Sequence, residues 1–215
     1  ISTLRDAGGL WDKYPVEQVA TPEGYARNPE LVINFYNERR KQLLEVRPND
    51  GHLGLAELEA DFNVTVVTQN IDNLHERAGS RRIIHLHGEL TKVCSSRDPY
   101  NPHYIKELKP DEYEVKFGDK AGDGTQLRPF IVWFGEPVPE IETAVNYVEK
   151  ADIFVIIGTS MNVYPAAGLL NYVPREAEVY LIDPKPVDVH SMRRIHVIQK
   201  GASEGVRELR SLLQP

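Results

Sequence analysis

Asp152-Ile153-Phe154-Val155-Ile156-Ile157, followed by Gly158-Thr159-Ser160, is the stretch that decides the fold. An unbroken run of apolar, mostly β-branched residues predicts a strand buried on both faces, as in a parallel sheet. The turn that follows carries backbone N–H groups and hydroxyls, which suit a phosphate. Such turns also occur as simple helix caps, and this one is not a P-loop because it lacks Gly-Lys-Ser/Thr.

Shorter strand and helix patterns alternate on either side of this stretch. We expect strands at 64–67, 82–86, 131–134, 152–157, 179–182 and 196–198, and helices at 28–44, 50–61, 140–150 and from 203 onward. Asn28 followed by Pro29 predicts the first helix start, and Asp50 and Ser203 are expected to cap later helices. Buried strands alternating with helices predict an α/β fold with a mostly parallel sheet covered on both faces.

Composition and charge exclude several classes of protein. The chain has 215 residues, 41% hydrophobic and 27% charged, which is typical of a globular protein and not of a disordered one. Lys and Arg number 25 against 32 Asp and Glu, and the net charge of −7 argues against nucleic acid as a partner. No apolar run is long enough to predict a membrane span. The single cysteine excludes an intrachain disulfide and a zinc site built from two CxxC pairs.

Residues 91–129 interrupt the alternation, being rich in Lys, Asp, Pro, Tyr and Gly. We interpret them as a small inserted lobe. Residues 1–90 and 130–215 then form the large domain, and a second part of the small lobe is expected within 12–50.

Two polar segments follow expected strands, where ligands bind in parallel α/β sheets. Thr68-Gln69-Asn70-Ile71-Asp72-Asn73-Leu74-His75 suits a ribose and a carboxamide, or else forms an Asx-rich turn that caps a helix. His85-Leu86-His87-Gly88 is expected to place both histidines on one sheet face. A histidine here could act as a general base, lie in the core with its hydrogen bonds satisfied, or supply half of a metal site. Gly88 permits backbone or a ligand to approach closely.

Taken together, these segments resemble the sirtuins, the NAD-dependent protein-lysine deacylases, and the shorter bacterial sirtuins in particular. The matching motifs, in family order, are Arg5-Asp6 with Gly9-Leu10-Trp11, residues 68–75, His87-Gly88-Glu89-Leu90, Val132-Trp133-Phe134-Gly135-Glu136, Gly158-Thr159-Ser160 and Val163-Tyr164-Pro165-Ala166. The resemblance implies a Rossmann-like large domain that binds NAD.

The resemblance also implies the chemistry and its residues. His87 corresponds to the catalytic base, which takes a proton from the ribose hydroxyls after the acyl oxygen has displaced nicotinamide at C1′. The products are free lysine, nicotinamide and O-acyl-ADP-ribose. The implied NAD-binding residues are Arg5, Gln69, Asn70, Ile71, Asp72, Gly158, Thr159, Ser160 and Ala202. Residues that clamp the substrate backbone are Val132, Phe134, Gly135, Glu136, Val163 and Tyr164.

Tyr36 and Arg39 sharpen the expected substrate. They lie three residues apart on the first long helix, so both can point into one pocket. A phenol and a guanidinium together can hold a carboxylate, as in sirtuins that remove succinyl and malonyl groups. The alternative is a surface arginine beside a tyrosine packed on the core.

Three departures from the family are visible. The chain opens at Ile1, at what corresponds to the end of the family's Gly-rich phosphate loop, so we expect the first strand and that loop to be missing from this chain. Only Cys94 remains where most sirtuins hold zinc, so we expect no zinc of that type. Aromatic packing of Tyr100, Tyr104, Tyr113 and Phe117 is expected to hold the lobe instead. Asp183 replaces an Asn-x-Glu segment and is expected to bind a ribose hydroxyl.

The favoured interpretation is a cytoplasmic NAD-dependent deacylase that acts on succinyl-, malonyl- and acetyl-lysine in proteins or peptides. A sirtuin-like protein ADP-ribosyltransferase and a non-catalytic NAD-binding module remain the alternatives. Neither nucleic acid nor a membrane is expected as a partner.

Overall fold

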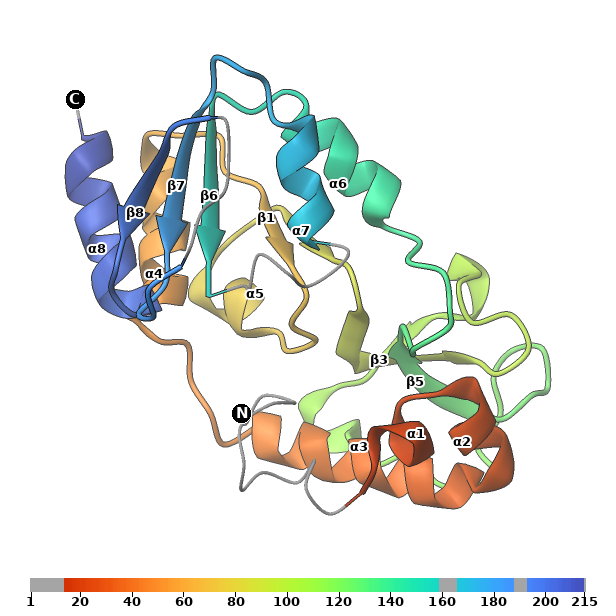
Figure 1. Ribbon diagram of the computed structural model, residues 1–215. Helices are drawn as coiled ribbons and strands as arrows, with labels where there is room; N and C mark the ends of the chain where they lie inside the picture. The colour runs from red at the N-terminus through yellow and green to blue at the C-terminus, as the bar shows by residue number, and fades with distance from the viewer. Residues whose placement is uncertain (1–13, 159–165, 188–192, 215) are drawn as a thin grey trace. The chain divides into compact units, whose positions relative to one another are not determined.

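The computed structural model describes residues 14–158, 166–187 and 193–214 (Figure 1). The described chain forms two compact units, and the backbone passes between them repeatedly. The first unit takes in the described residues of 14–47, 70–73 and 85–139. The second takes in those of 48–69, 74–84 and 140–214. Within the described residues, no helix has the length and apolar character needed to cross a membrane.

The second unit contains the parallel sheet. Its strands β6 (Ile153–Ile157), β7 (Glu178–Ile182) and β8 (Ile195–Ile198) pair in that order, and both pairings are parallel. The last residues of the three strands are in register, so their carboxyl ends lie at the same edge of the sheet. The helices of this unit are α4 (Asp50–Glu57), α5 (Leu74–Ala78), α6 (Ile141–Val148), α7 (Ala166–Leu169) and α8 (Ala202–Leu213). The expected α/β fold with parallel strands and helices is confirmed.

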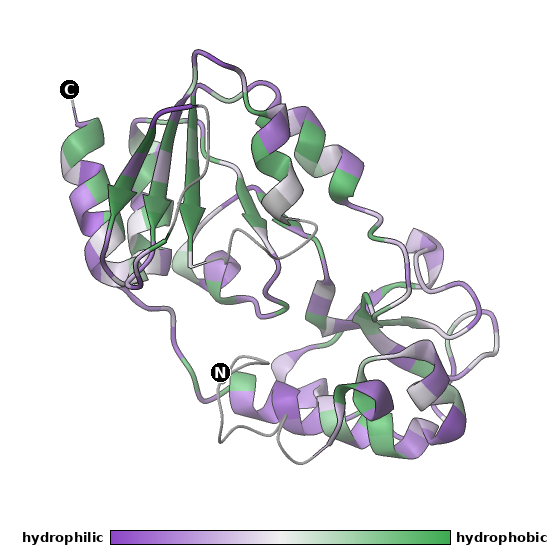
Figure 2. Cartoon of the chain, in the orientation of Figure 1, coloured by the Kyte–Doolittle hydropathy of each residue, from purple (hydrophilic) through white to green (hydrophobic). Residues whose placement is uncertain are grey.

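An apolar cluster joins this sheet to α8 and to the short 3-10 turn η2 (Leu58–Ala60) that follows α4. The buried members are Leu58, Tyr180, Ile182, Ile198, Val206 and Leu209. Figure 2 shows the corresponding concentration of hydrophobic residues along β6, β7 and β8. Removing each such side chain from water contributes roughly 1.5–3 kcal/mol, so this cluster stabilises the packing of α8 and η2 on the sheet. The smaller strands β1 (Val66–Thr68) and β2 (Ile83–His85) form a separate two-stranded sheet.

Two of the expected helix caps were placed one or two residues too late. Asn49, not Asp50, caps α4: its side chain accepts the His52 N–H, while His52 Nδ1 accepts the Asn49 N–H. This reciprocal pair satisfies two free donors and is a stronger cap than one aspartate. Gly201, not Ser203, precedes α8, so Ser203 lies inside its first turn.

The first unit is built from three helices and an antiparallel sheet. The helices are α1 (Val16–Val19), α2 (Pro22–Arg27) and α3 (Pro29–Leu43). Asn28 caps α3 by accepting the Leu31 N–H at 3.2 Å, and Pro29 follows at the first helical position, as expected. The sheet has the order β4 (Lys106–Glu107), β3 (Gly88–Ser95), β5 (Leu127–Ile131), with the 3-10 turns η3 (Pro102–Tyr104) and η4 (Pro110–Glu112) between β3 and β5.

The β3–β5 pairing differs from what the sequence predicts. A strand was expected at 131–134, but β5 ends at Ile131, because the backbone turns back where Glu136 N–H donates to the Trp133 carbonyl. Gly135 has a φ of +90° in this turn. Residues 85–90 and 130–139 lie in the first unit together with residues 91–129.

Apolar packing in the lobe comes only in part from the residues expected: the Tyr100 ring packs 6.4 Å from that of Phe130, centre to centre, but Phe117 does not contribute. Phe117 is 59% exposed and therefore does not hold the lobe. Val115 is buried instead, in a cluster with Ile33 of α3 and Val93 of β3. The Asn37 side chain fixes the Val115 backbone from both sides, since Nδ2 donates to its carbonyl and Oδ1 accepts its N–H.

Candidate functional site

His87 lies in a turn of the first unit rather than on a strand. β2 ends at His85 and β3 begins at Gly88, so strict alternation does not place the two histidines on one sheet face as expected. The turn depends on Gly88, whose φ is +86° and where a Cβ would overlap the carbonyl oxygen of Phe130. The close approach expected at Gly88 is therefore made by the Phe130 backbone. His87 itself is half-buried.

His85 is buried, and its ring forms a hydrogen bond with the main chain at Asn70. Its Nδ1 lies 3.0 Å from the Asn70 carbonyl oxygen, which can only accept, so this ring nitrogen carries the proton. The next carbonyl, of Ile71, accepts the Leu90 N–H at 2.8 Å. The first unit therefore anchors the backbone of residues 70 and 71. Asn70 is exposed, and Ile71 and Asp72 are half-buried.

Residues 132–136 are bonded directly to the histidine turn. Val132 N–H donates to the His87 carbonyl at 2.9 Å, and Phe134 N–H donates to the Ala20 carbonyl at 3.0 Å. The Phe134 side chain is 61% exposed, and Gly135 is exposed beside it. The structure thus brings His87, Val132, Phe134 and Gly135 of the expected site together within one unit.

Glu136 faces Arg128 rather than solvent. Its two carboxylate oxygens accept from Arg128 NH1 and NH2, each at 3.0 Å, and Oε1 also accepts the Trp133 N–H at 2.9 Å. The side chains of Arg128 and Glu136 are 4% and 12% exposed. Arg128 is a structural residue that the sequence analysis missed. The available signal was a single arginine inside an otherwise apolar stretch, eight residues before a glutamate.

Tyr36 and Arg39 share α3, as their spacing predicts, and both are buried, at 0% and 3% exposure. Tyr36 O–H donates to the Val19 carbonyl at 2.8 Å, and Trp133 Nε1–H donates to the Tyr36 oxygen at 3.0 Å. Burial raises the pKa of Tyr36, so its hydroxyl keeps its proton. Burial also lowers the pKa of Arg39, whose guanidinium lies 5.5 Å from the centre of the Phe35 ring. The arginine is therefore not a surface residue.

The remaining described candidates belong to the second unit. Gly158 follows β6 and has a φ of +60°, and its N–H donates to the Ile182 carbonyl. Asp183 follows β7, and its carboxylate accepts the Lys185 N–H at 2.8 Å. Ala202 is the first residue of α8, after β8. All three thus follow the carboxyl ends of parallel strands, where ligands bind in such folds. Gln69 directly follows β1 in the same unit.

Five expected site residues lie outside the described residues: Arg5, Thr159, Ser160, Val163 and Tyr164.

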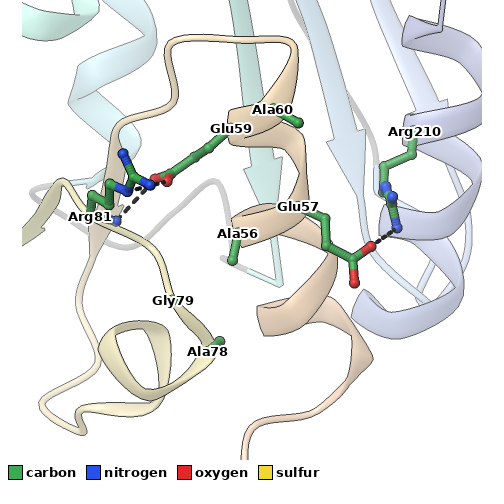
Figure 3. A pocket seen from close by; sticks show the side chains of 8 residues that line it. All are labelled: Ala56, Glu57, Glu59, Ala60, Ala78, Gly79, Arg81 and Arg210. Carbon is green, nitrogen blue, oxygen red and sulfur yellow. Dashed lines mark hydrogen bonds and ion pairs between the residues drawn. The ribbon is translucent and has the colours of Figure 1, made fainter.

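A shallow depression between α4 and α5 holds none of the expected site residues (Figure 3). Its floor is made of small residues such as Ala56 and Ala78. Its charged groups are already paired: Arg210 with Glu57, and Arg81 with Glu59. This depression therefore does not coincide with the expected site.

The lobe residues do not fit the zinc that the sirtuin resemblance implies. Cys94 is buried with its Sγ 3.8 Å from the Pro129 carbonyl, and burial raises its pKa to about 12, whereas a zinc ligand is a thiolate. The neighbouring Ser95 donates to Asp123 Oδ2 at 2.5 Å, and Thr125 Oγ1 donates to Asp123 Oδ1 at 2.6 Å. Ser95 also accepts two backbone N–H groups, from Arg97 and Asp98. This Ser95–Asp123–Thr125 cluster joins the end of β3 to the segment before β5 through hydrogen bonds.

Comparison with known proteins agrees with the fold. The family model of the Sir2 family matches residues 1–165. The chain belongs to the Sir2 family.

Two relatives show how close the similarity is. A protein of Bacteroides thetaiotaomicron named NAD-dependent protein deacylase is 85% identical over 215 residues, covering 100% of this chain and 92% of its own. A protein of Helicobacter pylori with the same name is 47% identical over 209 residues, covering 97% of this chain and 89% of its own. A solved structure described as a Sir2 homolog–NAD complex matches with a TM-score of 0.81 and 35% identity, covering 100% of this chain and 85% of that one.

Proposed function

We propose that this chain is an NAD-dependent protein-lysine deacylase that removes succinyl and malonyl groups in addition to acetyl groups. Membership of the Sir2 family, the names of its relatives and the solved NAD complex of a similar protein support NAD as the co-substrate. The products are free lysine, nicotinamide and O-acyl-ADP-ribose. Protein or peptide substrates carrying acyl-lysine are the partners, and we propose the cytoplasm as the location.

One observation carries the catalytic assignment: the 2.9 Å bond from Val132 N–H to the His87 carbonyl. It ties the proposed general base to the segment proposed to hold the substrate. A histidine is neutral and basic near neutral pH, so His87 can take a proton from a ribose hydroxyl. Phe134 and Gly135 are both exposed, and we propose that an extended peptide contacts the Phe134 side chain and pairs with the backbone of this segment by strand addition.

The polar groups present suit NAD. Gln69 and Asn70 carry amides that can pair with the nicotinamide carboxamide, and Asp72 and Asp183 carry carboxylates that accept from ribose hydroxyls. We assign the other NAD contacts to Arg5, Ile71, Gly158, Thr159, Ser160 and Ala202. NAD supplies the electrophilic C1′ carbon, and the chain supplies orientation and the base. Val163 and Tyr164 are proposed to face the substrate backbone.

The acyl specificity rests on Tyr36 and Arg39. A buried guanidinium beside a protonated phenol attracts a carboxylate strongly, since charge-assisted hydrogen bonds gain strength when water is excluded. A succinyl or malonyl group carries such a carboxylate, and an acetyl group does not.

Arg39→Met tests this proposal. The variant keeps most of the buried volume and loses the charge, so we expect kcat/KM for a succinyl-lysine peptide to fall by roughly tenfold or more. Deacetylation should fall far less. The measurement is a mass-spectrometric time course with acetyl-, malonyl- and succinyl-lysine peptides and NAD.

Lys41→Met is the matched control, because Lys41 is an exposed cation on the same helix. Equal losses on both peptides in Arg39→Met would contradict the acyl pocket. ADP-ribose attached to protein instead of O-acyl-ADP-ribose would identify a transferase. No nicotinamide release with any peptide would indicate a binding module.

A further inference from the structure

The Tyr36 hydroxyl has two partners of opposite character. An indole N–H can only donate, so the Tyr36 oxygen accepts from Trp133 Nε1 at 3.0 Å. A carbonyl can only accept, so the Tyr36 proton points to Val19 at 2.8 Å. The orientation of this buried hydroxyl is therefore fixed by the chemistry of its neighbours. Trp133 determines the direction from which the Tyr36 oxygen accepts a hydrogen bond.

The indole of Trp133 is itself held on several sides. The Arg128 guanidinium stacks over the ring at 3.9 Å from its centre, and the Trp133 main-chain N–H donates to Glu136 Oε1. The Tyr25 ring packs 5.3 Å away, centre to centre. Trp133 is 2% exposed, so its N–H has no access to bulk water that could replace the Tyr36 oxygen.

We propose that Trp133 is a specificity-determining positioning residue, whose indole N–H keeps the Tyr36 hydroxyl oriented as a donor to the carboxylate of an acyl group. This inference rests on the proposed acyl pocket. Because one acceptor position of the Tyr36 oxygen is occupied by the indole, its proton stays available to an acceptor. In the structure that acceptor is the Val19 carbonyl, and a carboxylate, being charged, is the stronger one. Trp133 acts through Tyr36 and does not touch the acyl group.

Trp133→Phe tests the inference, since phenylalanine keeps an aromatic ring under Arg128 and removes the N–H. We expect the ratio of kcat/KM for succinyl-lysine to that for acetyl-lysine to fall about tenfold, mainly through a higher KM for the succinyl peptide. Tyr25→Phe is the matched control: it removes a hydroxyl, bonded to Ser96, from the ring that packs on Trp133. This control should leave the ratio unchanged.

A double variant separates the pairwise effect from general damage. If Trp133 acts through Tyr36, then Trp133→Phe lowers the ratio in the wild type and has no further effect in Tyr36→Phe. Independent, additive losses would overturn the inference. If Trp133→Phe fails to fold, the indole N–H signal of Trp133 in a proton–nitrogen NMR spectrum serves instead. It should shift in Tyr36→Phe, and an unshifted signal overturns the inference.

The outcomes also separate this inference from the proposed function. An unchanged ratio in Trp133→Phe, together with a lowered ratio in Arg39→Met, overturns the role of Trp133 and supports the acyl pocket. A wild-type protein that does not remove succinyl groups, or equal losses on both peptides in Arg39→Met, overturns the proposed acyl specificity and with it the role of Trp133.

Discussion

Arg128 holds Glu136 through two parallel contacts of 3.0 Å, one from each terminal nitrogen of the guanidinium. Arg128 NH2 also donates to the Ile131 carbonyl at 2.8 Å, so one side chain binds both ends of the segment from 131 to 136. Burial lowers the pKa of Arg128, but its hydrogen bonds to Glu136 more than offset this, and the pKa is raised. The Arg128 guanidinium therefore stays charged across the ordinary pH range.

Arg128→Met should destabilise the protein by about 3–5 kcal/mol, because it leaves the Glu136 carboxylate buried without its partner. Urea denaturation measures this loss. Arg207→Met is the control, since Arg207 makes an exposed pair with Asp50 at 3.5 Å and should contribute roughly 0–1 kcal/mol. A loss in Arg128→Met no larger than the control would show that the pair does not hold the segment.

Asp123 should make the stability of the lobe depend on pH at acid values. Hydrogen bonds from Ser95 and Thr125 lower its pKa to about 2, and Arg97 adds a smaller effect of the same sign. Because the folded pKa lies below the unfolded value of about 3.9, the contribution is complete above that value. It is lost as the pH falls toward about 2.

Asp123→Asn should therefore be less stable than the wild type at neutral pH, with a difference that shrinks as the pH falls from about 5 to about 2. Thermal unfolding at a series of pH values measures it. Asp111→Asn, which changes an exposed carboxylate of η4, is the control. A wild-type-to-Asn difference that stays constant over this pH range would contradict the role of the charged cluster.

Metal removal should have no effect on the fold. The lobe offers hydroxyl and carboxylate oxygens that already bond to one another, and one protonated thiol, rather than four thiolates. We expect elemental analysis of the purified protein to find substoichiometric zinc and a chelator to leave the unfolding midpoint unchanged. Stoichiometric zinc, or a midpoint that falls with chelator, would refute this.

Local patterns in the sequence predicted what depends on local chemistry. The start of α3 follows from Asn28 and Pro29, and the strand β6 follows from its apolar run. The shared helix of Tyr36 and Arg39 follows from their spacing. Each of these features is decided within a few residues, where hydrogen bonding and backbone preference dominate.

Contacts between distant segments were not predictable in the same way. Nothing near Trp133 in the sequence indicates that its indole reaches Tyr36, 97 positions away. The burial of Val115 rather than Phe117 depends on Asn37, which lies 78 positions from it. The end of β5 at Ile131 likewise depends on a turn closed by Arg128 and Glu136. Such choices depend on tertiary packing, which local propensity does not encode.

The Ser95–Asp123–Thr125 cluster has a chemical consequence for the lobe. Peroxide oxidises thiolates in steps, and the last of these, to sulfinic and sulfonic acids, are irreversible. Hydroxyls and carboxylates do not undergo this oxidation, and the buried Cys94, with its pKa raised to about 12, holds almost no reactive thiolate. A lobe closed by these oxygen atoms is thus chemically inert toward oxidants that would open one closed by cysteines.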